Sequence, residues 1–164
     1  MLHLIIGRGK GKTTSAVGSA VRAAGHGKSV IFAQFLKDGS SGEVGVLRGI
    51  DGVTVITPAV NYGFTFQMTA AQLTDTAAEY ARMLEDIAGR EAFLIVLDEV
   101  LHALNTGLVN REQLEPILDK DCELVLTGYD PPAWLRERAA YISEVVNVKH
   151  PYDNGVEARE GVEY

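Results

Sequence analysis

A glycine-rich loop near the start of the chain limits the possible folds more than any other feature. The apolar run Leu2–Ile6 predicts a buried strand, and residues 14–24 have apolar side chains at helical spacing. The segment between them reads Gly7-Arg8-Gly9-Lys10-Gly11-Lys12-Thr13-Thr14. Glycines let a backbone curl around an oxyanion with its N–H groups pointing inward, and a helix N-terminus adds unpaired donors. The segment therefore predicts a loop that binds the phosphates of a nucleotide such as ATP.

The side chains at the end of this loop suit the same chemistry. Lys12 has the length to reach terminal phosphate oxygens, and the Thr13 hydroxyl is a ligand for Mg²⁺. The spacing differs from the common G-x-x-x-x-G-K-T pattern because Ile6 stands at the position of the first glycine. Two alternatives stay open: the loop is a glycine-rich hairpin or linker, and Lys10 is a solvated surface lysine.

Short apolar runs alternate with helix-forming stretches along the whole chain. We predict strands, each buried on both faces, at residues 2–6, 29–35, 53–57, 93–97, 123–127 and 143–148. Helices are expected at 14–24, at 69–88 with Thr69 as N-cap, at 110–120 with Asn110 and Gln113 as a capping box, and at 133–139. Residues 39–42 read as a loop near the site.

This alternation favours right-handed crossovers and a mainly parallel sheet of about six strands with helices on both faces. Residues 1–164 are therefore expected to form a single three-layer α/β domain. Ligands of such sheets bind beyond the carboxyl ends of the strands, so the segments to inspect follow Ile6, Phe35, Thr57, Leu97 and Thr127.

Two carboxylates, Asp98 and Glu99, follow the apolar run at 93–97. The arrangement resembles a Walker B element, in which a carboxylate holds Mg²⁺ beside the hydroxyl of the phosphate loop. Oxygen ligands suit this hard cation. We assign Thr13, Asp98 and Glu99 to the metal site. The alternative is that the acidic pair only caps the following helix.

Composition excludes several classes of function. The formal net charge of −7 argues against binding a nucleic-acid backbone, which needs clustered Lys and Arg. A single cysteine, Cys122, makes neither an intramolecular disulfide nor a Cys-rich zinc site. No apolar run approaches membrane-spanning length, and the first residues lack the pattern of a signal peptide. We expect a soluble, cytoplasmic protein without a membrane partner.

Seven segments, in order, are shared with one particular family. Together they resemble the ATP:corrinoid adenosyltransferases of the CobA/BtuR/CobO type, whereas a kinase would share only the first and the fifth. The segments are residues 7–14, Ala24-Gly25-His26-Gly27-Lys28, Gln34-Phe35-Leu36-Lys37, Gly63-Phe64-Thr65-Phe66, Val96-Leu97-Asp98-Glu99, Leu126-Thr127-Gly128 and Val148-Lys149-His150-Pro151-Tyr152-Asp153-Asn154-Gly155-Val156.

The resemblance implies a RecA-like P-loop domain, usually in a homodimer. Such an enzyme transfers the 5′-deoxyadenosyl group of ATP to Co(I) of cobalamin or a corrinoid precursor and releases intact triphosphate. ATP then lies in the loop with its phosphate order reversed. By matching position, Lys12 would stabilise the phosphates and Thr13 and Glu99 would serve Mg²⁺, so these three residues are the catalytic candidates. A flavodoxin-like protein is the expected electron donor.

The aromatic loop of the fourth segment is the candidate corrinoid site. Phe64 and Phe66 could form an apolar wall that excludes the lower axial ligand and leaves a four-coordinate Co(II) that is easier to reduce. The alternative is that both rings fill the core. Phe66 stands where the family often has tryptophan, and Tyr129 stands where it commonly has arginine. Longer family members also have a covering segment before the first strand.

Two other functions remain open at this point. The phosphate loop and the acidic pair alone would also serve a small P-loop phosphotransferase. The differences at Phe66 and Tyr129 would also suit a binding module that holds ATP and corrinoid without turnover.

Overall fold

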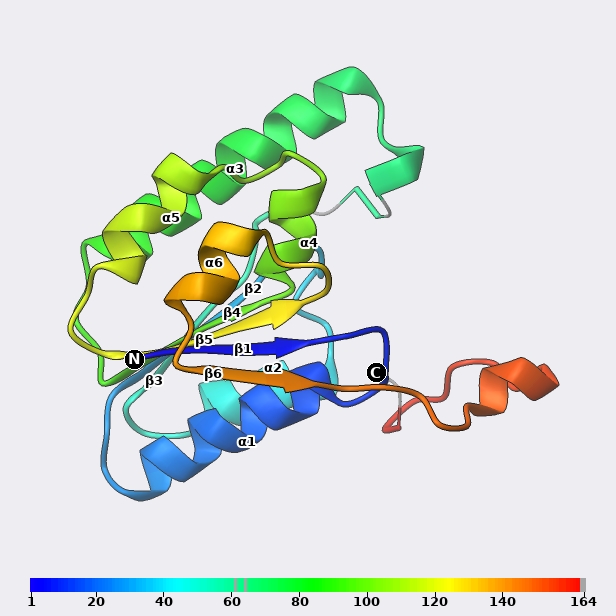
Figure 1. Ribbon diagram of the computed structural model, residues 1–164, viewed down its shortest axis with the longest axis horizontal. Helices are drawn as coiled ribbons and strands as arrows, with labels where there is room; N and C mark the ends of the chain where they lie inside the picture. The colour runs from blue at the N-terminus through cyan, green and yellow to red at the C-terminus, as the bar shows by residue number, and fades with distance from the viewer. Residues whose placement is uncertain (61, 64, 163–164) are drawn as a thin grey trace.

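A six-stranded sheet forms the middle layer of the protein. The computed structural model describes residues 1–60, 62–63 and 65–162. The sheet is parallel throughout, with strand order β3-β2-β4-β5-β1-β6. The strands are β1 (Leu2–Ile6), β2 (Val30–Gln34), β3 (Val53–Ile56), β4 (Leu94–Asp98), β5 (Glu123–Gly128) and β6 (Tyr141–Glu144). The carboxyl ends of all six strands therefore lie at one edge (Figure 1).

Helices cover both faces of the sheet, which confirms the three-layer α/β fold. On one face lie α1 (Lys12–Gly25) and α2 (Gly42–Arg48). On the other lie α3 (Ala70–Ala88), α4 (Val100–Asn105), α5 (Arg111–Leu118) and α6 (Ala133–Arg138) (Figure 1). Two short 3-10 helices, η1 (Thr65–Gln67) and η2 (Pro151–Asn154), lie outside these layers.

Small residues let α1 lie close to the sheet. Ala16, Ala20 and Ala23 are buried at helical spacing against large side chains such as Phe32 of β2 and Val96 of β4. Close packing of this kind fixes the helix axis, since a longer side chain at these positions would need space that the core lacks. The N-terminus of α1 is thereby held at the carboxyl edge of the sheet.

The expected helix starts are confirmed at two places. Thr69 accepts a hydrogen bond from the Gln72 amide at 3.3 Å, and Asn110 accepts one from the Gln113 amide at 3.0 Å. In both cases the glutamine side chain bonds back to the capping residue, so each start is a complete capping box.

The sixth strand differs from its prediction in position and in burial. It spans Tyr141–Glu144 rather than residues 143–148, and all four of its residues are exposed. As an edge strand, β6 pairs with β1 alone among the strands that the structure describes. Beyond it, the Val145 carbonyl accepts a hydrogen bond from the Gly9 amide at 2.9 Å. The strand ends early because the next residues bond to the glycine-rich loop.

Helix α2 was not predicted. It begins at Gly42, inside the segment that we read as a loop, and buries Val44 and Leu47. Its sequence contains Gly42 and Gly45, which favour other conformations over a helix by about 1 kcal/mol each. Burial of its two apolar side chains overrides this local preference.

Candidate functional site

The glycine-rich loop joins β1 to α1 in a conformation that requires glycine. Gly7 has φ of 110° and Gly11 has φ of 121°, values that other residues rarely adopt. A Cβ atom on Gly7 would lie 2.3 Å from the Val145 carbonyl oxygen, and one on Gly9 would lie 2.7 Å from it. The backbone after β6 thus packs directly against the loop, and side chains are excluded on that side.

A cavity of about 630 Å³ opens beside this loop at the carboxyl edge of the sheet. Six of the eight predicted ATP-binding residues, Gly9, Lys10, Gly11, Lys12, Thr13 and Thr14, line it. Gly7 and Arg8 instead line a neighbouring cavity of about 360 Å³. The remaining lining of the larger cavity comes from Val17, Lys37, Gly42, Glu43, Glu99, Gly161 and Val162.

Two of the loop amides that were expected to face the phosphates donate instead to other parts of the chain. The Gly9 amide donates to the Val145 carbonyl at 2.9 Å, and the Lys10 amide donates to the Asn147 side-chain oxygen at 3.1 Å. The first amides of α1, which begins at Lys12, have no partner inside the helix because of its geometry. The donors toward an anion are therefore concentrated at the start of α1, together with the Lys12 ammonium.

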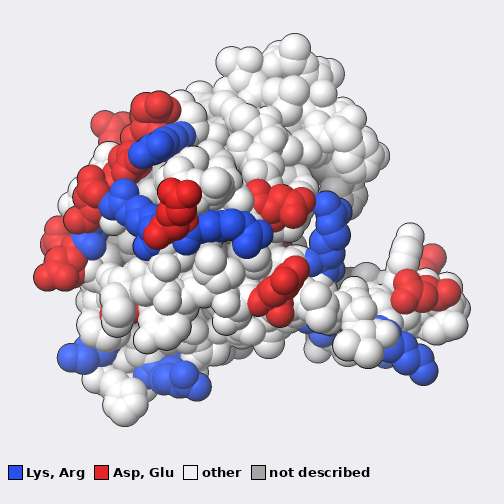
Figure 2. Space-filling view, in the orientation of Figure 1, with Lys and Arg blue, Asp and Glu red and all other residues white. Residues whose placement is uncertain are grey.

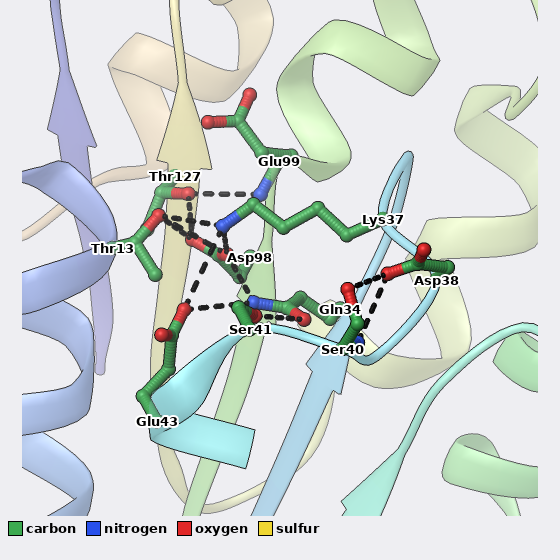
Figure 3. A network of polar contacts seen from close by, with 10 residues as sticks. All are labelled: Thr13, Gln34, Lys37, Asp38, Ser40, Ser41, Glu43, Asp98, Glu99 and Thr127. Carbon is green, nitrogen blue, oxygen red and sulfur yellow. Dashed lines mark hydrogen bonds and ion pairs between the residues drawn. The ribbon is translucent and has the colours of Figure 1, made fainter. Parts of the chain in front are cut away.

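Asp98 is the centre of a buried polar network at the end of β4 (Figure 3). Its side chain has no exposed surface. It accepts hydrogen bonds from Thr13 Oγ1 at 3.0 Å and from Thr127 Oγ1 at 2.7 Å. Gln34 Nε2 donates a further bond at 3.3 Å. One carboxylate thus joins the ends of β2, β4 and β5 to the start of α1.

Lys37 reaches the same carboxylate from the segment between β2 and α2 (Figure 3). Its Nζ lies 3.1 Å from Asp98 Oδ2 and 3.2 Å from Thr13 Oγ1. The nearest oxygen of Glu43 is 3.9 Å away. About a third of the Lys37 side chain is exposed, at 31%, and it lines the larger cavity.

Glu99 extends into the cavity from a strained backbone. Its φ of 61° is unusual for a residue with a side chain, and its amide donates to Thr127 Oγ1 at 2.8 Å. Figure 3 shows its carboxylate directed away from the Asp98 network. Burial and then the nearby Asp98 charge raise the pKa of Glu99, while Lys12, Lys37 and His102 pull it down.

Thr13 and Glu99 offer two oxygen ligands of the kind that Mg²⁺ binds together with phosphate and water. The Thr13 hydroxyl donates its proton to Asp98 and accepts a hydrogen bond from Lys37 Nζ, which leaves one lone pair to face a cation. Glu99 supplies a carboxylate on the cavity wall. Among the residues that the structure describes, no group of three or more His, Cys, Asp or Glu side chains could hold a metal by itself.

The candidate corrinoid residues are only partly described. Phe64 lies outside the described residues, and Phe66, in η1, is 80% exposed. Phe66 therefore does not fill the core, and it is not among the residues that line the larger cavity. Residues 52–74 contain no Lys, Arg, Asp or Glu. Figure 2 shows the resulting uncharged surface beyond α4, over η1 and the start of α3.

The difference from the family at Tyr129 has a structural counterpart. The Arg8 guanidinium lies 5.0 Å from the centre of the Tyr129 ring and 3.2 Å from an Asp130 oxygen. Both Arg8 and Tyr129 line the smaller cavity. A positive charge is thus present next to Tyr129, although it comes from the glycine-rich loop.

The sequence analysis assigned no chemical role to several residues of the site, although three of them, Gln34, Lys37 and Thr127, lie in segments shared with the family. They share a position at the carboxyl edge of the sheet or directly after it, and they are Gln34, Lys37, Glu43, Thr127 and Asn147. The rule that ligands bind at this edge could have identified Thr127, which ends a predicted strand, and Gln34, which lies one residue before the end of another. Asn147 had no such signal because its strand was placed too far along the chain.

A strand, a glycine loop and a helix N-terminus, with a buried carboxylate beside the loop threonine, define a P-loop nucleotide-binding protein. The family model of the ATP:corrinoid adenosyltransferases BtuR/CobO/CobP matches residues 1–164. The chain belongs to this family of transferases.

Sequences of corrinoid adenosyltransferases from three bacteria match this chain over 96–100% of its length. A "Corrinoid adenosyltransferase CobA" of Salmonella typhimurium is 34% identical over 176 residues, covering 100% of this chain and 85% of that protein. A "Corrinoid adenosyltransferase" of Escherichia coli K12 is 32% identical over 175 residues with the same coverage. One of Pseudomonas aeruginosa is 32% identical over 167 residues, covering 96% of this chain and 80% of that protein. Within the described part of the chain, no helix has the length and apolar character to cross a membrane.

Proposed function

We propose that this protein transfers the 5′-deoxyadenosyl group of ATP to Co(I) of a corrinoid and releases triphosphate. The observation that carries the proposal is the 630 Å³ cavity, in which the start of α1, Lys12 and Glu99 face one space. Membership of the adenosyltransferase family supports the same reaction.

The proposed reaction makes the triphosphate a leaving group. Co(I) supplies an electron pair to the C5′ carbon of ATP, a cobalt–carbon bond forms, and the C5′–O bond breaks with its electrons on the triphosphate. The protein needs no nucleophile of its own. Lys12 and the first amides of α1 stabilise the charge that develops on the leaving oxygen. Reversed placement of ATP in the loop would direct C5′ toward the corrinoid.

We further propose Thr13 and Glu99 as the residues that hold Mg²⁺, with Asp98 orienting the Thr13 hydroxyl through their 3.0 Å hydrogen bond. When bound, Mg²⁺ neutralises part of the triphosphate charge. Both oxygens of Asp98 already accept hydrogen bonds, which supports an orienting role for this residue.

For the corrinoid we propose the uncharged surface that contains Phe66, with Phe64 as a second contact. An exposed ring in a stretch without charged residues suits the apolar face of a macrocycle better than it suits water. We also propose a cytoplasmic homodimer in which residues 1–164 form one domain, with a flavodoxin-like protein as electron donor.

The experiment mixes the purified protein with Mg-ATP and chemically reduced cob(I)alamin. The visible spectrum reports the photolabile alkyl-cobalt product, and ion chromatography identifies the phosphate species released. We expect the alkyl-cobalt product together with intact triphosphate in equal amounts.

Two other results would each select a different function. Release of ADP in the presence of an acceptor, without a cobalt–carbon bond, would identify a phosphotransferase. Tight binding of ATP and corrinoid with no turnover, even from pre-reduced Co(I), would identify a binding module. Phe66→Trp and Tyr129→Arg, which introduce the residues common in the family, would then be the first variants to test.

A further inference from the structure

Lys37 is placed where a cation is needed, although none of the proposed roles uses it. Its ammonium lies 3.2 Å from the hydroxyl of Thr13 and 3.1 Å from Asp98, and it lines the larger cavity. Figure 3 shows the side chain extending across the network from the segment before α2. The ammonium thus stands between the loop threonine and the buried carboxylate, next to the expected position of the triphosphate and its cation.

Contacts of the preceding residue fix the backbone at Lys37 and therefore the direction of its side chain. Leu36, the preceding residue, has φ of 58°, and its amide donates to the Tyr80 hydroxyl at 2.7 Å. Tyr80 is buried in α3 and packs edge-on against Phe35 with ring centres 5.0 Å apart. The strained backbone at Leu36 aims the following side chain at the cavity.

Of the Asp98 partners that the structure describes, Lys37 is the one best able to leave. Thr13, Thr127 and Gln34 together donate to both carboxylate oxygens. Asp98 therefore stays satisfied by hydrogen bonds when Lys37 moves. Lys37 is partly exposed at 31%, and a lysine side chain has four rotatable bonds on its stem.

We propose that Lys37 is a second triphosphate-binding lysine. In the free protein its ammonium is paired with Asp98 beside Thr13. With Mg-ATP bound, Thr13 would face Mg²⁺, and the Lys37 ammonium moves from Asp98 to a phosphate oxygen. Lys12 and Lys37 then both contact the triphosphate, which increases the charge stabilisation of the leaving group. The inference rests on the proposed function, because it takes triphosphate as the occupant.

The test measures binding of inorganic triphosphate by isothermal titration calorimetry, without corrinoid and without turnover. Lys37→Met removes the ammonium and is compared with Lys28→Met, which removes the same charge at a site where Nζ lies 5.3 Å from the Phe93 ring. We expect binding to Lys37→Met to weaken about 10- to 100-fold, the range for a hydrogen bond between charged groups. Lys28→Met should bind as the wild type does.

High salt separates direct contact from a distant effect of charge. At about 0.5 M salt the screening length falls to roughly 4 Å, so a long-range loss would disappear while a contact would persist. Lys37→Gln serves as a second variant if Lys37→Met folds poorly, since it removes the charge but keeps an amide donor on a slightly shorter side chain. Circular dichroism melts report the folding of each variant.

The outcomes separate this inference from the proposed function. Unchanged triphosphate binding in folded Lys37→Gln, or a loss that vanishes at high salt, would show that Lys37 only neutralises the acidic cluster. Weakened binding that persists at high salt, in a protein that makes no cobalt–carbon bond, would support Lys37 and reject the transferase. Failure of the wild-type protein to bind triphosphate would overturn both.

Discussion

Replacing Asp98 by asparagine tests whether the buried network holds the site together. The substitution keeps the shape of the side chain but replaces one acceptor oxygen by an NH₂ group. With the amide oxygen retained toward Thr13 and Thr127, the new NH₂ group faces Gln34 Nε2 and Lys37 Nζ, which are 3.3 Å and 3.1 Å away in the wild type. Donors then face donors at this oxygen position, and among the described residues Gln34 Nε2 and Lys37 Nζ keep only their contacts with Glu43 and Thr13.

The expected loss follows from these two contacts. The bond from Gln34 to a charged acceptor contributes about 1.5–3 kcal/mol when buried. The contact with partly exposed Lys37 is discounted for solvent screening to about 0–1 kcal/mol. Asp98→Asn should therefore lower the free energy of unfolding by roughly 2–4 kcal/mol, which for a chain of this size is a fall of roughly 4–16 °C in melting temperature.

The assay is thermal and urea unfolding followed by circular dichroism. Asp130→Asn is the control: it removes a carboxylate that bonds Arg8 at 3.2 Å, but both side chains are more than two-thirds exposed. We expect that variant within about 0.5 kcal/mol of the wild type. Equal melting temperatures for Asp98→Asn and the wild type would refute the argument that Asp98 joins three strands to α1.

Three further predictions address other parts of the site. Because burial raises the pKa of Glu99 above its ordinary 4.5, the folded protein binds this proton more tightly than the unfolded chain, so the contribution of Glu99 to stability falls as pH rises from 4.5 through the raised pKa. Glu99→Gln should remove this fall and be more stable at pH 7, as urea unfolding across pH 4–8 would show; an unchanged pH dependence would contradict it. Phe66→Ala should slow product formation from cob(II)alamin and a reductant but not from pre-reduced Co(I), and equal slowing in both assays would exclude a role in preparing Co(II). Gly9→Ala places a methyl group 2.7 Å from the Val145 oxygen, so it should lower the free energy of unfolding by about 1–3 kcal/mol and raise the KM for ATP. Gly18→Ala has open space around it in α1 and should raise the free energy of unfolding by up to about 1 kcal/mol. Calorimetric melts that rank the two variants in reverse would refute this account of the loop.

The sequence by itself determined the features that depend on neighbouring residues. An apolar run, three glycines and a lysine-threonine pair define a strand, a tight loop and a helix start because backbone conformation is chosen locally. The N-cap at Thr69 and the capping box at Asn110 are local for the same reason, and both were predicted correctly. Asp98 and Glu99 could be placed at the end of a buried strand, since the carboxyl ends of parallel strands meet at one edge.

Only the tertiary structure decided which distant groups face these residues. Gln34 lies on β2, Lys37 lies between β2 and α2, and Glu43 lies on α2. Nothing in their own spacing shows that Gln34 and Lys37 reach Asp98, which is 61 residues from Lys37, or that Glu43 accepts a hydrogen bond from Gln34. The end of β6 is set by the hydrogen bond from Gly9 to Val145, a contact across 136 residues that no local preference encodes. Strand order brings these segments together, and among the described residues no buried side-chain nitrogen or oxygen lacks a hydrogen-bond partner.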